Sequence, residues 1–250
     1  TVGTIAVSYD ATDGHSGIAQ IFLLWKTQDT DWAVFDTVND SDSGTVGFNP
    51  PGDDKYFFAS WARDHAGNNE DFDGTPDTQT VYDTARPASD CDAPHYVSGA
   101  TIAVSYSAED VECGIKNVEL WYRFDGGEWI YSGHISTEST AGVFDFIPND
   151  YHTSGFLDAT TDGQYDFYTI AYDYAEWSED PPATPDASTT YDTIRPESAC
   201  SSPEFSMSAS IAVSYIATDT TAGIASVDLY YTLSSSGSDP VLWGTSTAGT

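Results

Sequence analysis

Apolar and polar residues alternate along short segments of this chain, which is the pattern of strands with one buried face. Every second residue from Ile102 to Tyr106 is apolar or aromatic, and Val118, Leu120 and Tyr122 share one face of the next such segment. Further strands are expected at 129–135, 143–147, 164–172 and 189–193. Since no stretch has the 3.6-residue periodicity of a capped helix, the chain is predicted to be all-β.

The strand pattern repeats along the chain. Ile5 to Tyr9 recurs as Ile102 to Tyr106 and as Ile211 to Tyr215, at spacings of 97 and 109 residues. Thr80 to Pro87 likewise matches Thr189 to Pro196. Similarity at a fixed period indicates tandem domains, and each unit has the length of a β-sandwich. The sequence therefore predicts tandem β-sandwich domains, the last one incomplete.

Three repeats are expected, at 1–87, 88–196 and 197–250. The first has no opening strand, and the third carries only the N-terminal half of the pattern. A half sandwich would leave sheet edges and core residues uncovered. We expect the chain to be a piece of a longer array, with strand addition from neighbouring molecules as the alternative.

The charge of the chain is strongly negative. It has 40 Asp and Glu residues against 7 Lys and Arg, a net charge of −33. Such a surface repels nucleic acid and anionic membranes, so neither is expected as a partner. No apolar run approaches the ~20 residues of a membrane span, so no membrane insertion is expected in this segment. The acidic residues are predicted to attract Ca²⁺, to reflect a high-salt habitat, or both; the alternative is that they only maintain solubility.

Two groups of acidic residues are candidates for Ca²⁺ binding, because the linkers between repeats and two loops of the next repeat should meet at one pole. At the first junction the candidates are Asp83, Asp90, Asp92, Asp110 and Asp173; at the second they are Asp192, Glu197 and Asp219. Ca²⁺ takes 6–8 oxygen ligands, mostly carboxylates and carbonyls. The alternative is that these aspartates cap turns through nearby backbone amides.

The same pole should bring Cys91 near Cys113, so we predict a disulfide between them that closes a loop of about 22 residues and stabilises by roughly 3 kcal/mol. Such a bond would indicate an oxidising, extracellular setting. Cys200 has no equivalent partner, because Ala222 stands where Cys113 stands in the second repeat. Asn39 begins an Asn-Asp-Ser sequence, a possible glycosylation acceptor.

The face of the sheet opposite the predicted core is unusually apolar. A polar array does not need an apolar outer face, so we predict that this face contacts another domain or subunit. The residues are Phe22, Leu24, Phe57, Trp61, Trp121, Tyr168, Tyr172 and Tyr230.

Several of these segments resemble a known group of proteins. Ala11-Thr12-Asp13 followed by Ser16-Gly17-Ile18, the Asp-x-Ala-Gly-Asn turn at 64–68, and Tyr165 to Asp173 are similar to immunoglobulin-like and fibronectin-III-like repeats of bacterial and archaeal surface proteins. The resemblance implies an extracellular, all-β array of tandem immunoglobulin-like β-sandwich domains, the last one incomplete. Such repeats serve as stalks, spacers, adhesins or surface layers, so the resemblance alone does not choose among these functions.

Catalysis is not expected, because the repeats have no nucleophile elbow or zinc helix and their histidines do not recur at equivalent positions. The leading hypothesis is a non-catalytic structural protein that builds an extracellular filament, stalk or layer with other copies of itself. The alternative is an adhesin or carbohydrate-binding appendage, for which the insertion near Pro148 to Leu157 is the candidate binding surface.

Overall fold

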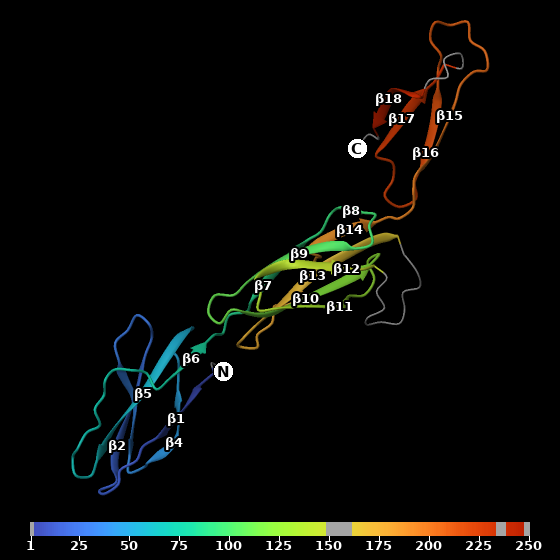
Figure 1. Cartoon of the computed structure of the whole chain (residues 1–250). Helices are drawn as coiled ribbons and strands as arrows, with labels where there is room; N and C mark the ends of the chain where they lie inside the picture. The colour runs from blue at the N-terminus through green and yellow to red at the C-terminus, as the bar shows by residue number, and fades with distance from the viewer. Residues whose placement is uncertain (1–2, 149–161, 234–238, 248–250) are drawn as a thin grey trace.

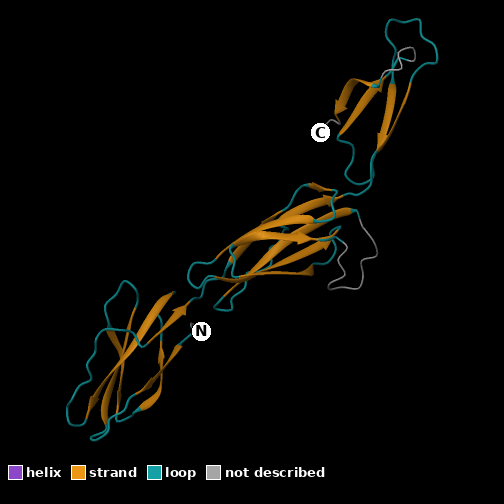
Figure 2. Cartoon of the chain, viewed as in Figure 1, coloured by secondary structure: helices purple, strands orange, loops and turns teal. Residues whose placement is uncertain are grey.

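The computed structural model describes residues 3–148, 162–233 and 239–247. All regular secondary structure in these residues is β-strand (Figure 2). The strands form three groups that follow one another end to end along an elongated molecule (Figure 1). The prediction of an all-β chain without helices is confirmed for the described residues.

The middle group is the most complete sandwich. Its strands are β7 (Ala88–Asp92), β8 (Tyr96–Val97), β9 (Ile102–Glu109), β10 (Ile115–Phe124), β11 (Ile130–Thr137), β12 (Ala141–Phe146), β13 (Gly163–Asp173) and β14 (Ala187–Tyr191). One sheet has the order β11-β10-β13-β14-β8 and the other has the order β12-β9-β7. All pairs are antiparallel except β14 with β8.

The core of the middle unit lies between these two sheets. Along β9 the residues alternate strictly between buried and exposed, as the sequence pattern predicted. Phe146 of one sheet contacts Tyr165 and Phe167 of the other, with ring centroids 5.7 and 5.2 Å apart. Aromatic rings of this size dominate the apolar area that such a core buries.

The first group repeats this arrangement with fewer strands. Its strands are β1 (Ile5–Asp10), β2 (Ile18–Lys26), β3 (Ala33–Asn39), β4 (Ser43–Phe48), β5 (Asp54–Asp64) and β6 (Thr78–Tyr82). The order β3-β2-β5-β6 matches β11-β10-β13-β14, and β1 pairs with β4 as β9 pairs with β12. Phe48, Tyr56 and Phe58 form the centre of its core.

The third group forms two separate two-stranded sheets, from β15 (Glu197–Ser201) with β16 (Ser214–Thr218) and from β17 (Ser226–Tyr231) with β18 (Val241–Thr247). No strand equivalent to β13 covers them among the described residues. Tyr215 is therefore 49% exposed, whereas the equivalent Tyr106 is 5% exposed. Each of the six sheets draws its strands from one of the three ranges expected for the repeats. No helix in the described part of the chain could cross a membrane.

Candidate functional site

The link between the first two units is an Asp-Thr pair that directly follows β6. The hydroxyl of Thr84 donates back to the carboxylate of Asp53 in the first unit, at 3.0 Å from each oxygen. Asp83 Oδ2 accepts forward from the backbone N–H of Cys113 in the second unit, at 3.2 Å. Two adjacent residues thus hold the linker to both units.

The second link makes the same contacts. Thr193 Oγ1 donates to Asp162 Oδ1 at 2.9 Å, and Asp192 Oδ2 accepts from the N–H of Ala222 at 2.9 Å. Ala222 is the counterpart of Cys113 in the repeat. The repeated Asp-Thr sequence therefore encodes a repeated junction.

The loop that meets each linker has a fixed shape. In the second unit, Asp110 Oδ2 accepts from the N–H groups of Cys113 and Gly114, at 3.1 and 2.6 Å. Gly114 has φ +81°, a left-handed conformation that glycine adopts without steric cost. Asp219 and Gly223 form the same loop in the third unit, with φ +74° at the glycine.

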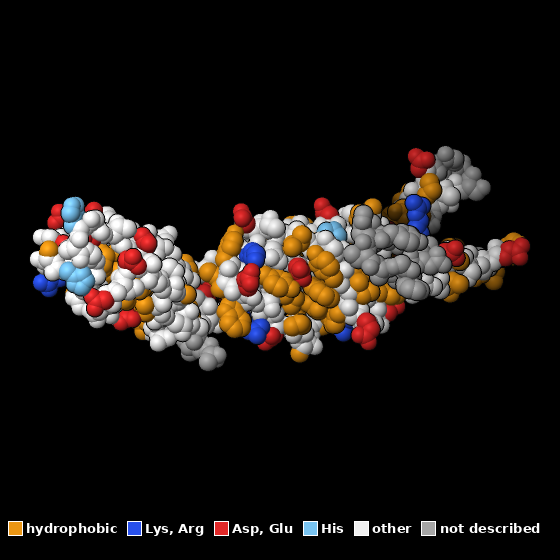
Figure 3. Space-filling view, turned by 90° about the horizontal axis from the view of Figure 1, so that it is seen from below, with side chains coloured by type: hydrophobic (Ala, Val, Ile, Leu, Met, Phe, Trp, Pro, Cys, Tyr) orange, Lys and Arg blue, Asp and Glu red, His pale blue; other side chains and the backbone are white. Residues whose placement is uncertain are grey.

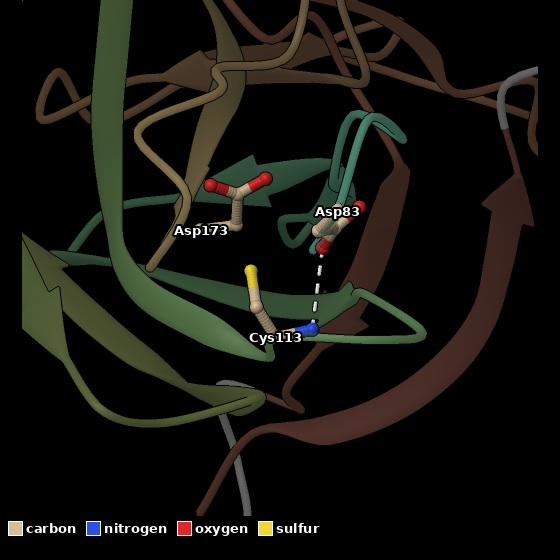
Figure 4. A group of neighbouring side chains, drawn as sticks. All are labelled: Asp83, Cys113 and Asp173. Atoms are coloured by element: carbon tan, nitrogen blue, oxygen red, sulfur yellow. Dashed lines mark hydrogen bonds between the residues drawn. The ribbon is translucent and has the colours of Figure 1, made fainter. Parts of the chain in front are cut away.

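Three side chains of the first junction converge on one point. One ligand atom each of Asp83, Cys113 and Asp173 lies within 4.8 Å of the other two. Asp83 comes from the linker, Cys113 from the β9–β10 loop and Asp173 from the end of β13. The Cys113 thiol points between the two carboxylates (Figure 4). Asp110 adjoins this cluster, because it and Asp83 accept from the same N–H of Cys113.

Two carboxylate oxygens of the junction are buried without a hydrogen-bond partner among the described residues. They are Asp110 Oδ1 and Asp173 Oδ2. Asp173 is completely buried, and only its Oδ1 is hydrogen-bonded, to the N–H of Trp177 at 2.9 Å. A buried carboxylate oxygen without a donor or cation costs free energy.

The site disfavours negative charge in its own groups. Burial, followed by the charges of Asp83 and Asp110, raises the pKa of Asp173 above its usual value. Burial and the hydrogen bond to Asp83 raise the pKa of Cys113 to about 12. A bound cation would reverse both effects, because it stabilises the ionised forms.

The structure brings together only part of the predicted first Ca²⁺ site. Asp83, Asp110 and Asp173 meet at the junction, but Asp90 and Asp92 do not belong to the cluster. Strand β7 starts at the junction and runs away from it, so that Asp90 pairs with Ser107 and Asp92 with Ser105. Because a strand rises ~3.4 Å per residue, both aspartates lie too far along the sandwich for their carboxylates to join the cluster.

At the second junction Asp192 and Asp219 hold the two sides of the same loop, through Ala222 and Gly223. Glu197 opens β15 opposite Thr218, next to Asp219 in the chain, and its side chain is exposed. The third unit has Ala222 at the position of Cys113, so this loop offers no thiol there.

The predicted Cys91–Cys113 disulfide is wrong for this structure, in which all three cysteines are free. Cys91 lies on β7 with its side chain in the core, where Sγ donates to Asp186 Oδ2 at 3.8 Å. Cys113 lies in the junction loop, where Sγ accepts from the N–H of Ala175 at 3.3 Å. The prediction placed both residues at one pole without accounting for the inward orientation of Cys91. Cys200 is exposed on β15.

Sequence reasoning missed further contacts across the first junction. Arg86 of the linker donates to the carbonyl of Ser178 at 2.6 Å and to the carboxylate of Asp180 at 2.9 Å. Its guanidinium lies 5.5 Å from the ring of Trp177, whose Nε1 donates to the carbonyl of Asp83. The repeated Arg-Pro after each Asp-Thr was the available signal for Arg86.

The predicted aromatic outer face exists but largely covers itself. Trp121 and Trp129 pack on Tyr168, with ring centroids 6.0 and 4.3 Å away, and Arg123 lies over Trp129 at 4.7 Å. Tyr168 is only 4% exposed, so its inclusion as a contact residue for another molecule is wrong. Hydrophobic side chains still gather over part of the middle unit's surface (Figure 3).

The other residues of this face vary in exposure. The rings of Phe22 and Trp61 pack together with their centroids 4.7 Å apart. The Nε1–H of Trp61 donates to the carbonyl of Glu70 in the loop that follows β5. Tyr172 donates to Glu119 at 3.3 Å. Leu24 and Phe57 are half-buried and Tyr230 is exposed. A lateral contact through these residues stays a prediction.

Asn39 is exposed at the end of β3, and its side-chain oxygen accepts from Gln20, so glycosylation there also stays a prediction. Most of the insertion proposed for ligand binding, from residue 149 onward, lies outside the described residues.

Comparisons with known proteins give likenesses among solved structures. No family model and no curated protein matches the chain. Among solved structures, the chain is similar to the fibronectin(III)-like modules of CbhA from Clostridium thermocellum, at 12% identity and a TM-score of 0.33. The match covers 75% of this chain and 94% of that chain. The strand orders and the two cores themselves show β-sandwich units of immunoglobulin-like or fibronectin-III-like type.

Proposed function

We propose that this chain is a non-catalytic spacer of an extracellular stalk, filament or surface layer, in which repeated β-sandwich units are held in line by their linkers. The observation that carries the proposal is the pair of equivalent junctions. At each one the linker threonine binds the preceding unit and the linker aspartate binds the following unit.

Short linkers with fixed contacts restrict bending between domains, whereas flexible linkers leave relative domain motion as the default. At the first junction Arg86 and Trp177 add contacts that span the linker and the second unit. An elongated array with such joints keeps whatever is attached to its two ends at a fixed separation. This property suits a stalk or the subunit of a filament made from copies of the same chain.

The junction carboxylates are proposed to bind divalent cations, with Ca²⁺ as the expected ion. Two aspartates belong to the cluster at the first junction with Asp110 beside them, and two aspartates meet at the second. At the first junction, Oδ2 of Asp173 is buried without a hydrogen-bond partner among the described residues. The chain has a net charge of −33, and repulsion between acidic residues opposes the close approach of neighbouring units. A cation at the junction would offset this repulsion locally.

The test is imaging of the whole chain by negative-stain electron microscopy, with the angle at each junction measured in Ca²⁺ and in chelator. We expect extended particles whose angle distribution at the second junction, where the candidate ligands are carboxylates, narrows in Ca²⁺. Asp219→Asn should abolish this narrowing and leave the first junction unchanged.

Asp145→Asn is the matched control, because Asp145 is exposed on β12. Compact particles, or junction angles as broad as those of a random linker in every condition, would exclude the spacer function. Extended particles whose junction angles do not change with Ca²⁺ would support the spacer function and exclude the proposed role of the cation.

A further inference from the structure

The first junction differs from the second in one chemically important residue. Cys113 stands in its loop where the first unit has Ser16 and the third has Ala222. The thiol is directed at the carboxylates of Asp83 and Asp173, with one ligand atom of each residue within 4.8 Å of the other two (Figure 4). A sulfur ligand changes which ions such a group prefers.

We propose that the first junction is a mixed oxygen–sulfur site for a thiophilic divalent cation of the Zn²⁺ class, bound by Asp83, Asp173 and the Cys113 thiolate. This inference rests on the proposed cation role of the junctions and narrows the class of ion at one of them. Zn²⁺ is bound by Cys, His and carboxylate ligands in four-coordinate sites, whereas Ca²⁺ takes 6–8 oxygen ligands.

An independent observation points to a ligand here. Asp173 is completely buried, and its Oδ2 has no hydrogen-bond partner among the described residues. Its other oxygen is held by the N–H of Trp177, which fixes the carboxylate in place. A positively charged ligand in the cluster would satisfy the oxygen that the protein leaves unpaired.

The surrounding hydrogen bonds hold the three ligands in position. Asp83 Oδ1 accepts from the N–H of Ala85, and its Oδ2 accepts from the N–H of Cys113. Asp110 fixes the loop that presents the thiol, by accepting from the N–H groups of Cys113 and Gly114. Contacts of this kind, around the ligands of a metal, orient them and tune the affinity of the site.

Binding would also join three separate segments of the chain. The ligands come from the linker, the β9–β10 loop and the end of β13. One cation would therefore connect the linker directly to the second unit. Binding releases the thiol proton to solvent, because the thiolate is the form that coordinates metal.

The test is a titration of the full chain with Cd²⁺, whose thiolate-to-metal charge transfer is read in the ultraviolet. The chain carries Cys200→Ser to remove the exposed thiol and is kept reduced. We expect one saturable band per chain, unchanged by a hundredfold excess of Ca²⁺ and competed by Zn²⁺.

Cys113→Ser, which copies the first unit at this position, should abolish the band. Asp173→Asn should weaken Cd²⁺ binding at least tenfold, and Asp145→Asn should not change it. Absence of a band in the parent chain, or an equal band in Cys113→Ser, would overturn the proposal.

Circular dichroism of each variant checks that the sandwich is intact. If Asp173→Asn fails to fold, Cys113→Ser still decides the result, because serine is accommodated in the equivalent loop of the first unit. Failure of this test leaves extended particles and Ca²⁺-dependent junction angles unaffected, so it is distinguishable from failure of the proposed function.

Discussion

At the scale of single residues, the middle unit keeps a second acidic group away from the junction. Asp186 accepts from the backbone N–H of Thr169 at 3.1 Å and from the thiol of Cys91. Burial, then the charges of Asp90 and Glu179, raise the pKa of Asp186 to about 6. The folded state therefore favours the protonated form of this carboxyl more strongly than the unfolded chain does.

This shift predicts a pH-dependent stability. Because the folded pKa exceeds the ordinary value of 3.8, the contribution of Asp186 is fully present below that value and is lost as pH rises through about 6. Asp186→Asn should remove this loss. In urea unfolding, the free energy of unfolding of the variant should rise relative to that of wild type by on the order of 1 kcal/mol between about pH 4 and about pH 7. This figure takes into account that Asp186 is partly exposed to solvent. An equal stability difference at both pH values would contradict the raised pKa.

At the scale of strands, β10 shows how the fold divides apolar residues between core and surface. Leu120 is completely buried between the two sheets, whereas Ile135 on the neighbouring β11 is 51% exposed. Both are large aliphatic residues, so side-chain chemistry alone does not distinguish them. Their positions on the two faces of the sheet decide how much each one stabilises.

Substitution to alanine should separate the two. Leu120→Ala should lower the free energy of unfolding of the middle unit by about 2–5 kcal/mol, because it leaves a cavity in the core. Ile135→Ala should stay within about 0.5 kcal/mol of wild type. Native-state hydrogen exchange of amides in β10 and β13 measures both effects. Similar losses of protection for the two variants would contradict the described core.

At the scale of the whole molecule, the linkers decide whether three units act as one rod. Thr84 and Thr193 each donate a side-chain hydrogen bond to an aspartate of the preceding unit, Asp53 and Asp162 respectively. Each bond is worth about 1 kcal/mol, enough to shift the balance between an ordered and a bending joint.

Replacing both linker threonines with valine retains side-chain volume and removes these bonds. The double variant should have a smaller radius of gyration in small-angle X-ray scattering, because its units bend toward one another more often. Thr45→Val is the control, since Thr45 hydrogen-bonds Ser8 within the first unit at 3.1 Å. A radius of gyration equal to that of wild type would show that these threonines do not hold the linkers.

The sequence by itself determined most strands of the middle unit, the repeat and the identity of the linkers, but it did not predict β7 or β8. Alternation places Ile102, Val104 and Tyr106 on one face in any extended conformation, and all three are buried. The repeated Asp-Thr likewise marked both junctions. These features depend on local geometry and on period, which a sequence displays directly.

Only the tertiary structure decided which of the side chains expected at the pole lie together there. Asp83 and Asp173 are distant in sequence, and the strand directions, not their spacing, bring them to the thiol of Cys113. The same directions turn Cys91 into the core and carry Asp92 away from the junction. Side-chain convergence depends on sheet pairing and on which face each strand turns inward, and the alternation pattern alone does not specify how loops and linkers meet at the pole.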